Sequence, residues 1–172
     1  MKNIGKHVVC AVLVLSGLCA MNIALADANT PLEQKSGYDM KTVERGRYLL
    51  RTSGCNDCHT PGYPLSEGKT PEDLWLMGDT FGWRGPWGTT YGANLRLLAG
   101  QMTEAQWVAM ARALKTRPPM PWFNLNAMTA EDLGAMYEFL RYLGPAGKPA
   151  PAWVPPDQEP PGPYATFPAP PR

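Results

Sequence analysis

The chain of 172 residues is poor in histidine and cysteine, with two and four respectively, and it has no run of charges of one sign. Its 16 basic and 15 acidic residues are almost balanced. Because nucleic-acid binding depends on clustered lysine and arginine that neutralise phosphates, this composition excludes nucleic acid as a partner. A length of 172 residues suits one domain with its own buried core better than two.

The first 26 residues have the features of a secretory signal peptide. Two lysines precede an apolar run from Val8 to Leu18, and Ala24-Leu25-Ala26 supplies the small residues that signal peptidase requires. We therefore predict a signal peptide over residues 1–26, a polar leader over residues 27–39 and export to the periplasm. An uncleaved anchor is the alternative, because the apolar stretch approaches the roughly 20 residues needed to span a bilayer.

Cleavage of that segment leaves few residues able to bind a metal. The exported chain keeps one histidine, His59, and two cysteines, Cys55 and Cys58. In an oxidising compartment such a pair could form a disulfide, or act as a redox-active dithiol of the thioredoxin kind. A structural zinc site is a weaker candidate, because it requires four cysteine or histidine ligands and only three are present.

The five residues Cys55-Asn56-Asp57-Cys58-His59 match the attachment motif for a c-type haem. Two thiols at this spacing add to the two vinyl groups of one haem, and the following imidazole binds the iron. A thioredoxin-like dithiol requires a parallel-sheet context, which the residues around this motif lack. We therefore predict one haem c, bound covalently through Cys55 and Cys58, with His59 as an axial ligand.

The segment before the motif adds a resemblance to a family. Val43-Glu44-Arg45-Gly46-Arg47-Tyr48-Leu49-Leu50, followed by the attachment motif, resembles the N-terminal helix and haem site of class I c-type cytochromes. The resemblance spans residues 42–143 and is closest to single-haem domains related to the cytochrome subunits of periplasmic alcohol and sugar-acid dehydrogenases. It implies a small all-α fold over residues 40–144, with helices wrapped around one haem and Gly46 at a close helix crossing.

The second axial ligand is expected to be a methionine, because no second histidine remains after cleavage. Most methionines fill protein cores, but Met120 lies in Arg117-Pro118-Pro119-Met120-Pro121-Trp122, where prolines hold the backbone extended. This run also resembles the methionine-ligand loop of class I cytochromes, which precedes their last helix. We therefore predict Met120 as the sixth ligand. A neutral, soft thioether favours ferrous iron and a moderately high reduction potential.

Local signals predict three further helices and no strands. One short helix would run from a cap at Thr70 to Met77, a second from the capping box Thr103-Glu104-Ala105-Gln106 to about Leu114, and a third from Thr129 to Gly144-Pro145. Residues 78–92 lack strand-like alternation and are interpreted as an irregular loop rich in glycine and aromatics. These patterns also favour an all-α fold.

In the related cytochromes the stretch that corresponds to residues 78–92 wraps the haem edge. Tyr91, Asn94 and Arg96 are therefore candidates to hydrogen-bond the haem propionates. Ordinary loop packing is the alternative for each of them.

The chain ends in a proline-rich tail. Eleven of the 28 residues over 145–172 are proline, a composition that cannot build a packed core and favours extended chain. Isolated aromatic residues such as Trp153 and Tyr164 suggest the hypothesis that the tail anchors on a partner enzyme. A tail that drapes over its own domain is the alternative.

Electron transfer is the function that these features favour. The chain would be an electron carrier and not an enzyme, either free or as the electron-accepting subunit of a dehydrogenase complex. Its partners would be a periplasmic dehydrogenase, a terminal oxidase or another cytochrome, with membrane association only through an uncleaved N-terminal segment or a partner. The alternative is a haem-based catalyst or gas-binding protein, which needs a displaceable sixth ligand and usually a distal acid or base.

Covalent attachment predicts that haem stays with the chain after denaturation. On a denaturing gel, the wild-type band should keep its haem colour and the Cys55→Ser/Cys58→Ser variant should lose it, because only the two thioethers survive unfolding. Release of haem from the wild-type protein into acidified acetone would contradict the prediction.

Overall fold

The computed structural model describes residues 35 and 37–168. The predicted signal peptide, residues 27–34 of the predicted leader and the last four residues of the tail lie outside the described residues. The helices within the described part are α1 (Met40–Thr52), α2 (Cys55–His59), α3 (Leu95–Gly100), α4 (Glu104–Ala113), α5 (Trp122–Ala127) and α6 (Ala130–Leu143), with a 3₁₀ turn at Glu72–Leu74. None of them combines the length and the hydropathy needed to cross a bilayer.

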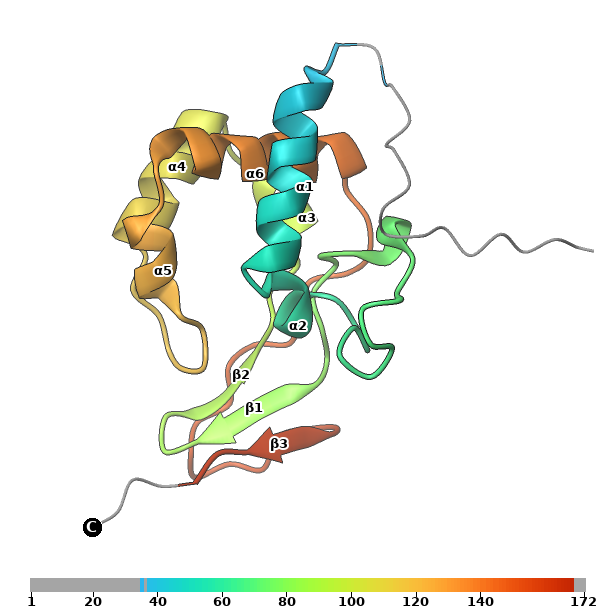
Figure 1. Ribbon diagram of the computed structural model, residues 1–172. Helices are drawn as coiled ribbons and strands as arrows, with labels where there is room; N and C mark the ends of the chain where they lie inside the picture. The colour runs from blue at the N-terminus through green and yellow to red at the C-terminus, as the bar shows by residue number, and fades with distance from the viewer. Residues whose placement is uncertain (1–34, 36, 169–172) are drawn as a thin grey trace, which may run out of the picture.

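The prediction of an all-α fold is wrong, because the described residues also form a three-stranded sheet. β1 (Gly82–Gly85) and β2 (Gly88–Tyr91) form an antiparallel hairpin, and β3 (Tyr164–Thr166) pairs with β1 in parallel. The hairpin lies where the sequence suggested an irregular loop. The fold is therefore mixed α/β, with the sheet extending from one end of the helical part (Figure 1).

These strands have no visible sequence pattern for a physical reason. Each contains only three or four residues, too few for an alternation of apolar and polar side chains to show. Three of the eight residues in β1 and β2 are glycine, which has a low strand propensity. The third strand follows the first by about 80 residues, so no local signal connects them.

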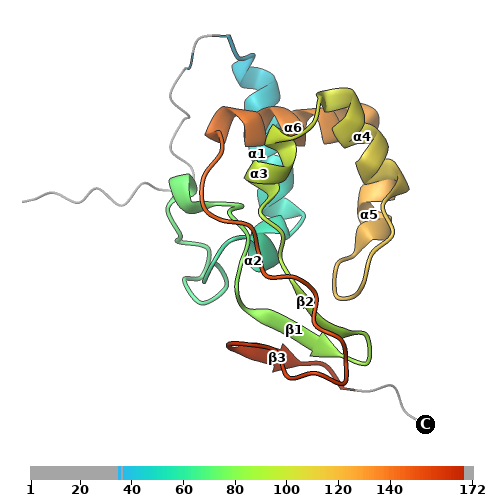
Figure 2. The ribbon, with the colours of Figure 1, turned by 180° about the vertical axis from the view of Figure 1, so that it is seen from behind.

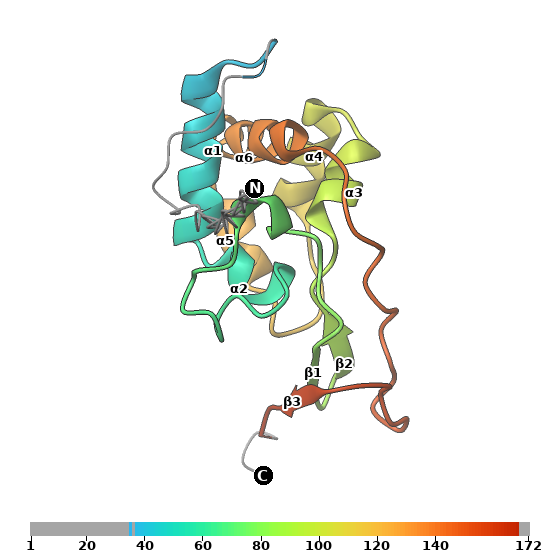
Figure 3. The same cartoon turned by 90° about the vertical axis from the view of Figure 1, so that its right-hand side faces the viewer.

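The helical core is built on the crossing of α1 and α6, and it confirms the predicted close approach at Gly46 (Figures 1 and 3). A Cβ atom on Gly46 would overlap the carbonyl oxygen of Ala135. Val43 and Leu50 of α1 and Phe139 of α6 are fully buried around this point. Only glycine allows the two backbones to come this close.

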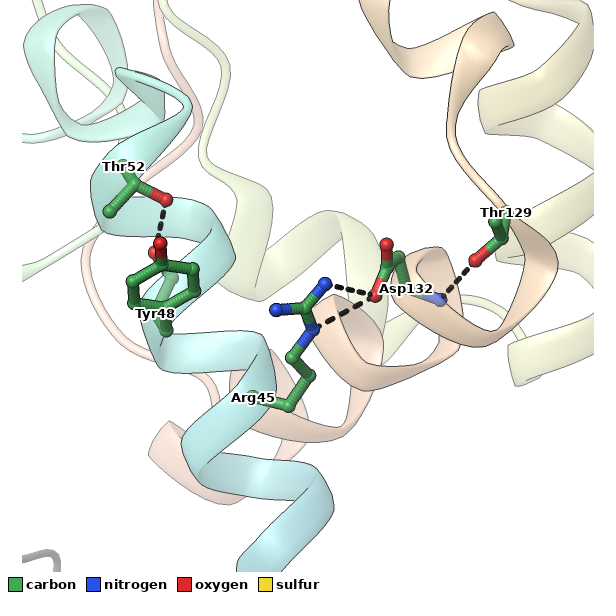
Figure 4. A network of polar contacts seen from close by, with 5 residues as sticks. All are labelled: Arg45, Tyr48, Thr52, Thr129 and Asp132. Carbon is green, nitrogen blue, oxygen red and sulfur yellow. Dashed lines mark hydrogen bonds and ion pairs between the residues drawn. The ribbon is translucent and has the colours of Figure 1, made fainter.

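Polar contacts hold the edge of the same crossing (Figure 4). The Arg45 guanidinium lies 2.9 Å from the Asp132 carboxylate, which joins α1 to α6. The backbone N–H of Asp132 donates to the Thr129 hydroxyl at 3.1 Å, so Thr129 caps α6 as predicted. The capping box at Thr103 and the helix end at Gly144, with φ of +75°, are also confirmed.

The predicted helix from Thr70 to Met77 is wrong. Only the 3₁₀ turn forms there, and the Thr70 hydroxyl bonds to the Ser66 hydroxyl and does not cap a helix. Leu76 has φ of +61°, a left-handed conformation that an α-helix cannot contain. Conversely, α3 and α5 were not predicted, because six residues give too little periodicity to detect.

Residues 145–168, which we call the C-terminal strap, run from the end of α6 past β2 to β3 (Figures 2 and 3). Thr89 and Val154 exchange backbone hydrogen bonds of 2.8 and 3.0 Å, which fix the strap to β2. Trp153 donates its indole N–H to the Trp87 carbonyl at 2.9 Å, and Tyr164 lies within β3. Both aromatic residues considered as anchors for a partner are thus engaged within their own chain.

The crossing predicts opposite outcomes for two buried glycines on facing helices. Gly46→Ala should lower the free energy of unfolding by about 1–3 kcal/mol, because the new methyl group meets backbone that cannot move aside. Gly134→Ala is the matched control, since its methyl group would meet only the flexible end of Glu104, and helix propensity favours alanine by about 1 kcal/mol. Denaturant unfolding measures the free energy of unfolding of both variants. Equal values would contradict the close approach of the α1 and α6 backbones at Gly46.

Candidate functional site

The attachment motif forms α2, a single turn directly after α1. Its N-cap Gly54 has φ of +70°, so a left-handed residue separates the motif from α1. Positions three and four residues apart share one face of a helix, so Cys55, Cys58 and His59 project together. The neighbouring Asn56 is buried and points elsewhere: its amide oxygen accepts a hydrogen bond from the Thr60 hydroxyl at 2.7 Å.

His59 is held in one orientation. Its ring is buried, and Nδ1 lies 2.7 Å from the carbonyl oxygen of Ala93. Because a carbonyl can only accept, Nδ1 carries the proton and Nε2 is left with a free lone pair. Burial lowers the pKa of His59, which favours the neutral imidazole that a metal ion binds.

Backbone packs directly against the end of α2. The Gly78 N–H donates to the His59 carbonyl at 2.8 Å, and a Cβ on Gly92 would overlap the Cys58 carbonyl oxygen. The residue at position 92 must therefore be glycine for Ala93 to reach the imidazole.

The three motif side chains open into an apolar cavity of about 370 Å³. Its wall is formed by the helices α2 to α6, by the strands β1 and β2, by the Met120 loop (residues 114–121, between α4 and α5) and by Pro151 and Trp153 of the C-terminal strap. A volume of this order and a mostly apolar lining are typical of cofactor sites. The Met120 loop and α2 lie on facing sides of the molecule's interior (Figures 1 and 2).

The cavity contains all four predicted haem residues, because Cys55, Cys58, His59 and Met120 each line it. Three other methionines also line it, namely Met110, Met128 and Met136. Met77 and Met102 do not line it. The competitors of Met120 for the sixth position are therefore those three residues, of which Met110 and Met136 lie within helices.

Of the three candidates for propionate contacts, only Tyr91 lines the cavity. Asn94 caps α3 by accepting from the Leu97 N–H, and its amide group donates to the carbonyl oxygens of Ala146 and Lys148. The Arg96 guanidinium donates to three carbonyl oxygens, those of Asp73, Leu143 and Gly144. Asn94 and Arg96 therefore use their polar groups to connect backbone segments of the chain.

The two cysteines lack the properties of a redox-active dithiol. Burial raises the pKa of Cys55 to about 12 and also raises the pKa of Cys58, with the nearby Asp57 carboxylate adding to both effects. A reactive dithiol needs a lowered pKa. The two sulfurs are not joined in a disulfide, and within the described part no three Cys, His, Asp or Glu side chains form a cluster that could hold a bare metal ion.

The donor set and the cavity together fit a haem c. Two thiols, one oriented imidazole and one thioether are the groups that attach and ligate such a haem. The Tyr91 hydroxyl is shielded from solvent and has no hydrogen-bond partner among the described residues. Burial raises the pKa of Tyr91, so the phenol stays protonated. Its O–H can therefore donate a hydrogen bond to an acidic group bound in the cavity.

The chain matches no protein-family model, no curated protein and no solved structure. The resemblance to class I c-type cytochromes therefore remains a prediction that rests on the quoted residues.

The wall of the cavity includes residues that sequence reasoning missed. Trp153 was interpreted as part of a tail, and Trp107 lies in a helix predicted without a role in the site, yet both line the cavity. Trp107 donates its indole N–H to the Leu133 carbonyl at 3.0 Å, which fixes α4 against α6. An isolated tryptophan among prolines was the only signal for Trp153, and it does not say which surface the ring covers.

The hydroxyl of Tyr91 should matter only if a bound group accepts its proton. In the haem-loaded protein, Tyr91→Phe should lower the thermal midpoint and shift the reduction potential, by the equivalent of a hydrogen bond of about 0.5–1.5 kcal/mol. Thr89→Val is the matched control, because the Thr89 hydroxyl is also buried without a partner among the described residues but does not line the cavity. If redox titration and melting give the same result for both variants, Tyr91 does not bond the bound group.

Proposed function

We propose that this chain is a periplasmic electron carrier with one haem c, bound through Cys55 and Cys58 and ligated by His59 and Met120. The observation that carries the proposal is the convergence of these four side chains on one apolar cavity. Each alone has an ordinary structural explanation. Together they form the complete donor set of a haem with histidine and methionine ligands.

When bound, the haem would supply a reversible one-electron couple between ferrous and ferric iron. The residues of the chain then tune that couple. The Ala93 carbonyl fixes the tautomer and orientation of His59, and burial favours its neutral imidazole. The Met120 thioether would favour the ferrous state. The mostly apolar wall lowers the polarity around the site and so raises the cost of an added charge, which would also favour the reduced form.

An electron carrier must bring its redox centre close to the surface. Several residues of the cavity wall are exposed, among them Arg117, Pro121 and Asn124 at the Met120 loop and the start of α5. The cavity therefore reaches solvent on the side of the Met120 loop. We propose that redox proteins, such as a periplasmic dehydrogenase, a terminal oxidase or another cytochrome, exchange electrons there.

The lining also favours a carrier over a haem catalyst or gas-binding protein. Within the described residues, the cavity wall contains no carboxylate, and His59 is its only histidine. Catalysis on a bound molecule usually needs a second acid or base on the far side of the iron. A methionine at that position would instead close the coordination sphere.

Substitution of the four cavity methionines tests the ligand assignment. Met120→Ala should abolish the weak far-red charge-transfer band of the oxidised haem protein and should accelerate carbon monoxide binding to the reduced protein, because the iron loses its sixth ligand. Met110→Leu, Met128→Leu and Met136→Leu are matched controls, since each removes a thioether from the same cavity at similar volume. Loss of the band in any control, with the band intact in Met120→Ala, would contradict the proposal.

A further inference from the structure

The Met120 loop is fixed at its two ends by helices. On the α5 side, the Asn126 amide group donates to the carbonyl oxygens of Ala111 and Leu114 at 2.9 and 3.3 Å. These bonds tie α5 to the end of α4, from which the loop departs. They leave the middle of the loop, just before Met120, to be held by other parts of the chain.

One contact that positions the middle of the Met120 loop comes from the C-terminal strap. The Arg117 guanidinium lies over the Trp153 ring, 4.0 Å from its centroid, in a cation–π contact. The ring is itself anchored, because its indole N–H donates to the Trp87 carbonyl and the next residue, Val154, pairs with Thr89. Trp153 thus connects the hairpin to the Met120 loop, and it lines the cavity.

A second contact with the middle of the loop comes from β2. The Thr90 hydroxyl donates to the Pro118 carbonyl at 2.8 Å, one residue along the loop from Arg117. Both contacts therefore act two and three residues before Met120. Pro118, Pro119 and Pro121 restrict the backbone between and beyond them, so a constraint at Pro118 is transmitted to Met120 and not absorbed by chain flexibility.

We propose that Trp153 and Thr90 are positioning residues for Met120, which keep its thioether on the iron and so set the population of the methionine-ligated state. This inference rests on the proposed function and gives the C-terminal strap a role in it. Contacts of these two kinds each change an equilibrium by a factor of roughly two to ten. Their loss should therefore weaken methionine ligation without abolishing haem attachment.

The rate of carbon monoxide binding to the reduced protein reports the population in which Met120 has left the iron. In the haem-loaded full chain, Trp153→Ala and Arg117→Gln should each accelerate binding by roughly two- to fivefold, and Thr90→Val by roughly two- to tenfold. The far-red band should weaken and the reduction potential should fall in parallel. Arg117→Gln leaves the strap intact, so it tests the contact even if Trp153→Ala fails to fold.

The chain offers matched controls on α1, none of whose residues lines the cavity (Figure 4). Arg45 lies over the Tyr48 ring at 5.7 Å, so Tyr48→Ala removes an exposed aromatic–arginine contact of the same kind. The Thr52 hydroxyl donates to the Tyr48 carbonyl at 2.7 Å, so Thr52→Val removes a bond like that of Thr90. Neither control should change the binding rate, the band or the potential.

A double-mutant cycle between Trp153→Ala and Arg117→Gln shows whether the two side chains act through each other. The double variant should bind carbon monoxide no faster than the faster single variant, because both substitutions break one contact. Additive effects, or rates equal to those of the α1 controls, would overturn the positioning role. A wild-type protein without covalent haem would overturn the proposed function itself, whereas normal wild-type spectra with unresponsive variants would overturn only this inference.

Discussion

The structure depends on the close approach of residues 78–93 to the end of α2. Gly92 lies against the Cys58 carbonyl, the Gly78 N–H bonds to the His59 carbonyl, and the Ala93 carbonyl accepts from the imidazole. Because these are backbone contacts, they leave little freedom in the position of either segment. The same contact orients the His59 imidazole, closes one wall of the cavity and leads the chain into α3. A side chain at position 92 would disturb all three at once.

Polar residues near the site divide into two groups by what they bond. Asn94 and Arg96 are satisfied by backbone carbonyls, and Arg96 places its positive charge at the C-terminal end of α6, where the helix dipole is negative. Tyr91, the last residue of β2, has a hydroxyl at the cavity without a partner among the described residues. A buried donor without a partner is costly, and at the cavity wall a bound group could supply the missing partner of Tyr91.

The sheet and the C-terminal strap change how the Met120 loop is understood. A proline-rich loop alone is stiff, but its stiffness does not decide which part of the cavity it faces. Here Thr90 of the hairpin donates a hydrogen bond to the Pro118 carbonyl of the loop. The strap is attached to that hairpin, and its Trp153 ring contacts Arg117, the residue before Pro118. The three short strands therefore connect the two chain segments that flank the cavity on the methionine side. Their value is positional, since strands of three or four residues add little stability of their own.

The sequence alone determined those features whose signals are local. The attachment motif, the caps at Thr103 and Thr129, the stop at Gly144 and the small residue at the α1–α6 crossing each depend on a few neighbouring residues, and they were predicted correctly or stand as predictions. Tertiary structure alone decided which polar residues face the cavity, where the strap runs and that a sheet exists. Tyr91, Asn94 and Arg96 look equivalent in the sequence, and β3 finds β1 across about 80 residues. Such choices follow from which distant backbone groups come within bonding distance, and no local pattern of residues encodes that.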